Sequence, residues 1–61
     1  MTPYRYVVEQ RIQRSKCLLA NPNLPIADVA LNVGFASQSH FSTTFRRLTN
    51  TTPLRYRQAV H

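Results

Sequence analysis

Residues 25–47 of this chain read PIADVALNVGFASQSHFSTTFRR and contain its only glycine, Gly34. Glycine adopts a left-handed backbone conformation at little cost, and Ala30, a small residue one helical turn earlier, allows a second helix to cross closely. On its own, this pair is equally compatible with an ordinary helix end. With the pattern that follows it, the pair predicts a tight turn between two packed helices, a helix-turn-helix unit over about 26–48.

Each helix of this unit has a start signal and an apolar face. The first should run over about 26–33, with Asp28 in its first turn, where the helix dipole favours an acid. The second should begin after Ser37, whose hydroxyl can cap a free backbone N–H, and end near Leu48. Phe41, Phe45 and Leu48 fall on one side of it, which predicts core packing and not a platform for stacking bases. The inward residues expected in the first helix are Ile26, Val29, Ala30 and Val33.

Two more helices flank the unit, and each starts with a threonine followed by a proline. Thr2 and Thr52 are expected to cap these helices, because a proline at the first helical position needs no N–H. The helices should span about 3–20 and about 53–60. Together the segments predict an all-α fold, a small homeodomain-like helical bundle that forms one domain over 1–61. A rotation of about 100° per residue gives the apolar side of the first helix as Tyr4, Val7, Val8, Ile12, Leu18 and Leu19.

The chain is basic, with eight Lys and Arg residues against two acids and a formal net charge of +6. This charge favours nucleic acid, an anionic membrane surface or an acidic protein as the partner. The apolar stretches are only a few residues long, which argues against a membrane, and the first residues lack the apolar region of a signal peptide. The single cysteine, Cys17, cannot form an internal disulfide and is expected to be inert. These features predict a cytoplasmic protein.

Few residues offer catalytic or metal-binding chemistry. The carboxylate side chains are Glu9 and Asp28, no convincing pair of nucleophile and base is present, and a short chain offers little room for a pocket. His40, His61 and Cys17 do not have the spacing of zinc ligands. We therefore expect no enzyme activity, no metal, no cofactor and no small-molecule effector site in this chain.

The outer face of the helix that follows Ser37 is the expected functional surface. It carries hydroxyl, amide, imidazole and guanidinium groups and no acid, so it can contact base edges without repelling phosphates. Gln38 is placed to pair with an adenine edge, and Ser37 and Arg47 to hold phosphates. His40 is either a DNA contact or only an exposed side chain. The candidate DNA-binding residues are Ser37, Gln38, Ser39, His40, Ser42, Thr43, Arg46 and Arg47.

Short motifs recur at fixed spacings along nearly the whole chain. In the first helix they are Pro3, Tyr6-Val7, Arg11-Ile12 and Leu18-Leu19. Further on they are Ile26, Asp28-Val29-Ala30, Gly34-Phe35, Ser39, Phe41-Ser42, Phe45-Arg46, Thr52-Pro53 and Tyr56-Arg57. Together these motifs resemble the C-terminal half of the DNA-binding domain of AraC/XylS-family bacterial transcription regulators. The resemblance implies a linker helix followed by the second of two helix-turn-helix units, each of which meets its own segment of major groove.

The chain departs from the family pattern at three positions. Thr43 stands where arginine is frequent, which removes a bidentate contact to guanine and leaves the base preference open. Pro25 replaces a serine and so loses a capping box with Asp28, about 1 kcal/mol of cap stabilisation. Asn50 replaces a glycine and is expected to take the left-handed conformation after the third helix. Because the resemblance begins at the linker helix, the chain is expected to hold one of the two helix-turn-helix units of such a DNA-binding domain. One unit alone is expected to bind DNA weakly.

Arg11 lies on the apolar side of the first helix, in the surroundings of Val7, Val8, Ser15 and Leu18. A charge in such a place needs a partner. The expected partner is Asp28, and this pair would tie the linker helix to the second helix. The alternative is that the long stem of Arg11 carries its charge to solvent.

Two functional classes fit these features. The favoured interpretation is a sequence-specific DNA-binding transcription regulator of the AraC type, with its third helix in the major groove of double-stranded DNA. This interpretation predicts an affinity that falls steeply with salt and that differs among sequences. The alternative is a basic helical protein-interaction module that docks RNA polymerase or another regulator. Equal binding to specific and random duplexes, together with tight binding to a polymerase subunit, would favour the alternative.

Overall fold

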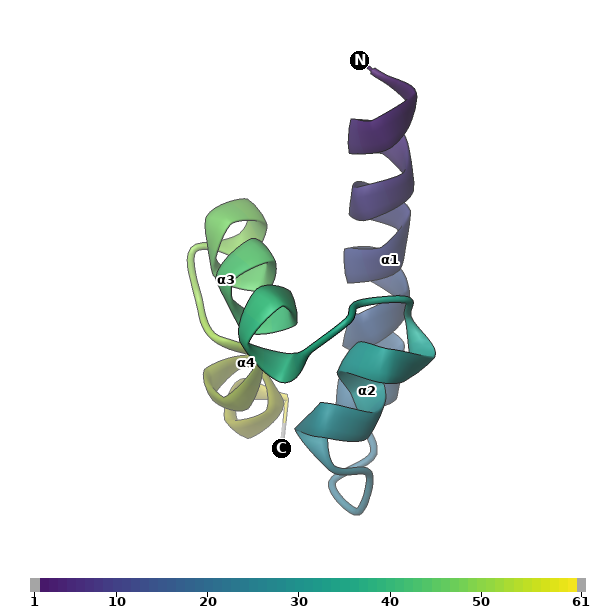
Figure 1. Ribbon diagram of the computed structural model, residues 1–61. Coiled ribbons are helices and arrows are strands. Elements are labelled where there is room, and N and C mark those ends of the chain that lie inside the picture. The colour runs from purple at the N-terminus through teal and green to yellow at the C-terminus, as the bar shows by residue number, and fades with distance from the viewer. Residues whose placement is uncertain (1, 61) are drawn as a thin grey trace.

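The computed structural model describes residues 2–60, which form four helices (Figure 1). They are α1 (Pro3–Leu19), α2 (Ile26–Asn32), α3 (Gln38–Thr49) and α4 (Pro53–Ala59). The predicted all-α bundle is confirmed, and the predicted helix ends differ from the observed ones by at most one residue. None of these helices is long and apolar enough to cross a membrane. Met1 and His61, a histidine considered above as a metal ligand, lie outside the described residues.

Side chains cap three of these helices at their start. The hydroxyl oxygens of Thr2, Ser37 and Thr52 each accept a hydrogen bond of 3.1 Å from the backbone N–H three residues further on. The prolines after the two threonines occupy the first helical position of α1 and α4, where no N–H is needed. α2 differs, because Pro25 at its N-cap makes no side-chain hydrogen bond. The predicted caps, and the predicted lack of one at Pro25, are confirmed.

The turn between α2 and α3 depends on Gly34, whose φ is +96°. Its N–H donates to the carbonyl oxygen of Leu31 at 3.1 Å, and the N–H of Phe35 donates to that of Ala30 at 2.9 Å. This pair of bonds is the Schellman arrangement, which ends a helix at a left-handed residue and turns the next side chain inward. Phe35 is buried accordingly. Asn50 ends α3 in the same left-handed region, with φ 62°, as predicted.

A row of aromatic rings runs through the core. The ring centroids of Phe35 and Phe41 lie 5.4 Å apart, those of Phe41 and Phe45 5.7 Å, and those of Phe45 and Tyr56 5.8 Å. Phe41 and Phe45 are fully buried, which confirms that they pack the core and do not offer a surface to bases. The buried apolar residues are Ile12, Leu19, Val29, Ala30, Val33, Phe35, Phe41 and Phe45.

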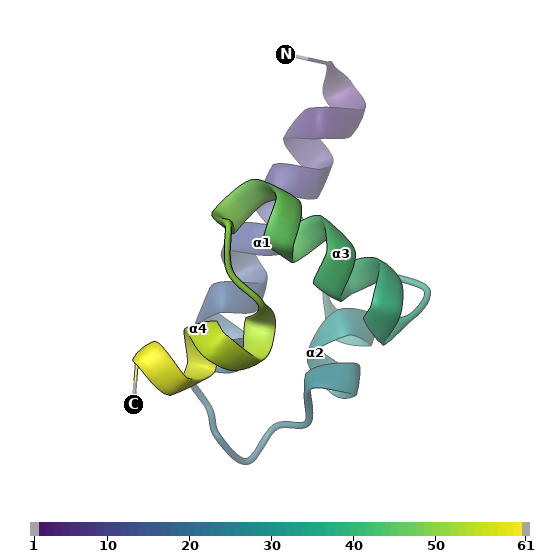
Figure 2. The ribbon, with the colours of Figure 1, turned by 90° about the vertical axis from the view of Figure 1, so that its left-hand side faces the viewer.

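The main contacts between helices form a ring in which α1 meets α2, α2 meets α3, α3 meets α4 and α4 meets α1. Figure 2 shows α4 below one end of α3 and α2 below the other, with α1 behind them. The position of α3 relative to α1 is therefore set by the core that the two helices share and by the contacts of both with α2 and with α4.

The first half of α1 projects beyond the bundle (Figure 1). Tyr4 and Val7, predicted on the core side, are 72% and 43% exposed, so the prediction is wrong for these two residues. The other helices gather around the second half of α1, where Ile12 and Leu19 are buried. Periodicity identifies the apolar face of a helix but not how far along that face its neighbours extend.

Candidate nucleic-acid interface

The outer face of α3 is open to solvent, and Figure 2 shows this helix crossing the front of the molecule. No acid lies within the twelve residues of α3 or at its two caps. A helix of this length is about 18 Å long, and an α-helix fits the major groove of DNA. Of the candidate residues, Ser42 is half-buried. The exposed ones are Ser37, Gln38, Ser39, His40, Thr43, Arg46 and Arg47.

Two contacts fix the start of α3. The Oγ atom of Ser37 accepts a hydrogen bond from the backbone N–H of His40 at 3.1 Å, which leaves the Ser37 O–H as a donor for another group. The His40 ring packs edge-on against the ring of Phe35, with centroids 5.2 Å apart and an interplanar angle of 84°. His40 is therefore exposed but held against the turn, so its ring has a defined place at the edge of the face.

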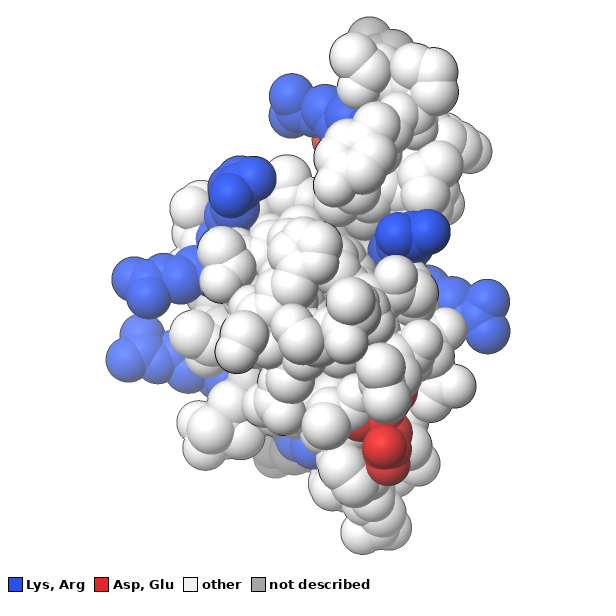
Figure 3. Space-filling view, viewed as in Figure 1, with Lys and Arg blue, Asp and Glu red and all other residues white. Residues whose placement is uncertain are grey.

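The guanidinium groups of α3 are not neutralised by the acids of the protein. Arg46 and Arg47 are exposed in the last turn of α3, where the helix dipole favours cations. Within residues 2–60 the salt bridge is that of Arg5 with Glu9, at 3.0 Å along α1. Figure 3 shows Lys and Arg side chains at both margins of the molecule, with Asp and Glu confined to small areas. The margin on the α3 side is thus positively charged.

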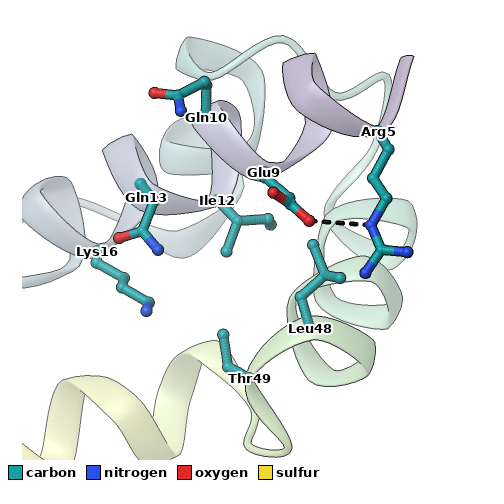
Figure 4. A pocket seen from close by; sticks show the side chains of 8 residues that line it. All are labelled: Arg5, Glu9, Gln10, Ile12, Gln13, Lys16, Leu48 and Thr49. Atoms are coloured by element: carbon teal, nitrogen blue, oxygen red, sulfur yellow. Dashed lines mark hydrogen bonds and ion pairs between the residues drawn. The ribbon is translucent and has the colours of Figure 1, made fainter. Parts of the chain in front are cut away.

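Leu48 does not complete the buried face of α3. It shares the face of Phe41 and Phe45 but is 37% exposed, so the predicted burial of Leu48 is wrong, and Thr44 is buried. Leu48 borders an open groove of about 320 Å³ between α1 and the end of α3, with Arg5 and Glu9 on the α1 side (Figure 4). Leu48 is exposed because α1 and the last turn of α3 do not close against each other at this groove.

Arg11 and Asp28 do not form the predicted ion pair, since no salt bridge joins them among residues 2–60. The guanidinium of Arg11 instead lies against Gly34, and a Cβ built on Gly34 would stand 3.0 Å from Nε and 3.1 Å from Cζ of Arg11. Asp28 is exposed, and its backbone carbonyl oxygen accepts a hydrogen bond from Nδ2 of Asn32 at 2.9 Å. Arg11 therefore contacts the helix-turn-helix by packing on the backbone of Gly34 and not through an ion pair with Asp28.

Arg57 in α4 makes the contacts that sequence reasoning missed. Its Nε donates to the carbonyl oxygen of Leu19 at 3.0 Å, and its Nη2 donates to that of Leu24 at 2.6 Å. These acceptors lie 38 and 33 residues away in the sequence, so the periodicity of a single helix cannot predict the two hydrogen bonds. The only available signal was the place of Tyr56-Arg57 among the motifs of the family pattern.

A family model described as a helix-turn-helix domain matches residues 1–59. This span includes all four described helices and the whole outer face of α3. The chain belongs to the AraC-type helix-turn-helix family. The resemblance that the motifs indicated is confirmed by this match.

Relatives of this AraC-type chain are similar over most of its length. The uncharacterized HTH-type transcriptional regulator YdeC of Bacillus subtilis is 44% identical over 57 residues, 93% of this chain and 20% of the relative. The probable transcriptional regulator LumQ of Photobacterium leiognathi is 45% identical over 56 residues, 92% of this chain and 23% of the relative. The transcriptional activator RhaS of Escherichia coli O157:H7 is 38% identical over 58 residues, 95% of this chain and 21% of the relative. The chain spans about a fifth of the length of these relatives, and no solved structure matches it significantly.

Proposed function

We propose that the chain is a DNA-binding module of a bacterial transcription regulator and that it contacts double-stranded DNA with α3 in the major groove. The observation that carries this proposal is the outer face of α3, which exposes polar and basic side chains along its length and includes no acid. YdeC, LumQ and RhaS are named as regulators of transcription, which supports the proposal.

The proposed contacts follow from the position of each side chain around α3. By rotation, Ser39, Thr43 and Arg46 occupy the middle of the outer face, where base edges would be within reach. His40 and Arg47 lie on one flank. We assign Arg47 to a phosphate, because a cation at the edge of the groove meets the backbone before it meets a base.

The start of α3 supplies the remaining contacts. Gln38 can place its amide on an adenine edge if this end of the helix enters the groove first. Ser37 keeps its O–H free for a phosphate while its oxygen caps the helix. Ser42 is half-buried, so we assign it a contact at the edge of the interface.

A selection of duplexes from a random library by the purified chain tests the proposal. The chain is then titrated with the selected duplex and with a random duplex of equal length, over a range of salt concentrations. We expect the selected duplex to bind about tenfold or more tightly, and both affinities to fall steeply with salt as condensed cations are released. Equal affinity for the two duplexes, together with tight binding to an RNA polymerase subunit, would overturn the proposal in favour of a protein-interaction module.

A pair of variants locates the reading surface. Arg46→Ala removes a guanidinium from the outer face of α3, and we expect the preference for the selected duplex to fall about tenfold, as for one lost base contact. Arg14→Ala is the matched control, because Arg14 is also exposed but lies on α1 at a groove shared with Asn32 and Val33. The control should lower both affinities alike and leave the preference unchanged.

A further inference from the structure

α4 is fastened to the rest of the protein by two adjacent side chains. The ring of Tyr56 contacts the ring of Phe45 in α3, with centroids 5.8 Å apart and an interplanar angle of 68°. Arg57 donates its two hydrogen bonds to the corner between α1 and α2, at Leu19 and Leu24. One turn of α4 therefore joins α3 on one side to the end of α1 on the other.

Arginine suits this corner for electrostatic and geometric reasons. Leu19 is the last residue of α1, where the carbonyl groups have no partner within the helix and form the negative end of its dipole. Leu24 lies on the other side of the loop that leads to α2. The rigid, planar guanidinium donates toward both carbonyl oxygens at once, a geometry that the point charge of a lysine does not reproduce.

The orientation of α3 depends on this corner. α3 shares the hydrophobic core with α1, and its position is further set by its contacts with α2 and with α4, each of which also contacts α1 (Figure 2). Loss of the Arg57 hydrogen bonds would release α4 from the end of α1 and open the ring on that side. α3 would then keep its contacts with α2, with the turn at Gly34 and with the shared core, but it would lose the support of a fixed α4.

We infer that Arg57 is a positioning residue for DNA binding: by clamping α4 to the end of α1, it fixes the angle at which α3 meets the major groove. This inference rests on the proposed function. Arg57 itself is half-buried, and two of its five N–H donors are held by carbonyl oxygens of the protein, so the inferred role is exerted through α4.

The test compares Arg57→Met with Arg55→Met in the full chain. Arg55 is an exposed arginine two residues earlier in α4, so the control removes the same charge from the same helix. Affinities for the selected and the random duplex are measured at a temperature where circular dichroism shows each variant folded. We expect Arg57→Met to lower the preference for the selected duplex about tenfold, comparable to one mismatched base pair, and Arg55→Met to leave it unchanged. The random-duplex affinity and the salt slope should be the same for the two variants.

Two results would overturn the inference. A folded Arg57→Met chain that keeps the wild-type preference excludes a positioning role. A salt slope that is lower by about one unit than that of Arg55→Met identifies a direct phosphate contact instead. Arg57→Lys keeps the charge but can reach only one of the two carbonyl oxygens well, so this variant should give an intermediate preference for the selected duplex. It replaces Arg57→Met in the test if Arg57→Met does not fold. An unchanged preference in Arg57→Lys then excludes the role. A wild-type chain without any preference contradicts the proposed function itself, which distinguishes the two failures.

Discussion

The guanidinium of Arg11 in α1 lies against the bare backbone of Gly34, at the turn between α2 and α3. Two separate features of the structure require a glycine at this position. Its φ of +96° is a conformation that side chains rarely adopt, and a Cβ there would stand 3.0 Å from Nε of Arg11. The absence of a side chain thus serves both the Schellman turn and the approach of α1 to the helix-turn-helix.

Gly34→Ala should destabilise the protein for both reasons. The left-handed backbone alone costs about 1–2 kcal/mol for a residue with a Cβ, and the new methyl group presses on the guanidinium of Arg11. We expect the free energy of unfolding, measured by urea titration followed by circular dichroism, to fall by about 2 kcal/mol or slightly more.

The double variant of Gly34→Ala with Arg11→Ala separates the two contributions. With Arg11 shortened, the backbone strain remains but the contact is gone, so Gly34→Ala should cost less in this background. An equal cost in both backgrounds would show that the contact with Arg11 contributes nothing. No cost in either background would contradict the conformation of the turn.

The start of α2 can be improved, because Pro25 makes no side-chain hydrogen bond there. The N–H of Asp28 donates to the carbonyl oxygen of Pro25 at 3.0 Å. A serine hydroxyl at position 25 can accept from this N–H in its place, and Asp28 can reach back to complete a capping box. Pro25→Ser is compared with Pro25→Ala, because both remove the proline and so share its effect on the unfolded chain. Pro25→Ser should be the more stable variant by about 1 kcal/mol in thermal unfolding. Equal stability of the two would show that a hydroxyl at position 25 adds nothing to the bond that the Asp28 N–H already makes, and it would contradict the prediction.

Ser15 is fully buried, and its hydroxyl donates to the carbonyl oxygen of Ile12 at 2.6 Å within α1. This bond is internal to the helix, and alanine has the highest helix propensity. Ser15→Ala should therefore leave the unfolding midpoint unchanged or raise it, by up to about 0.5 kcal/mol in stability. Ser15→Leu is the contrasting variant, because extra methylene groups in this packed place should cost about 1–3 kcal/mol. A loss above about 1 kcal/mol in Ser15→Ala would show that the hydroxyl is needed.

Local features of the fold were predictable from the sequence. The caps at Thr2, Ser37 and Thr52, the left-handed residues Gly34 and Asn50 and the missing cap at Pro25 all depend on residues at most four apart. The inward face of α2 follows from its periodicity in the same way. These features were correct because the physical causes lie within the segments that show them.

Contacts between distant segments were not predictable in this way. Leu48 and the first half of α1 have the right periodicity for burial, but an open groove lies between α1 and the last turn of α3, and Leu48, Tyr4 and Val7 remain exposed. Arg11 has a nearby glycine backbone in place of the acid that its surroundings suggested, and Arg57 finds acceptors more than thirty residues away. Each of these outcomes depends on where whole helices end relative to one another, which a helical pattern does not specify.

The candidate interface also has features that the sequence predicted and features that it did not. Rotation around α3 correctly gave an outer face without acids and with exposed side chains at most of the candidate positions. It did not indicate that Ser42 is half-buried or that the His40 ring is held by Phe35. The assignment of individual residues to bases and phosphates stays a prediction.

The most direct test of α3 in the major groove is to compare the duplexes selected by the wild-type chain with those selected by Thr43→Arg. Thr43 is exposed at the middle of the outer face of α3, and arginine there can form two hydrogen bonds to guanine. We predict a change to guanine at one position of the selected site, with the other positions unchanged. Identical preferences at every position would contradict the placement of this face against the bases.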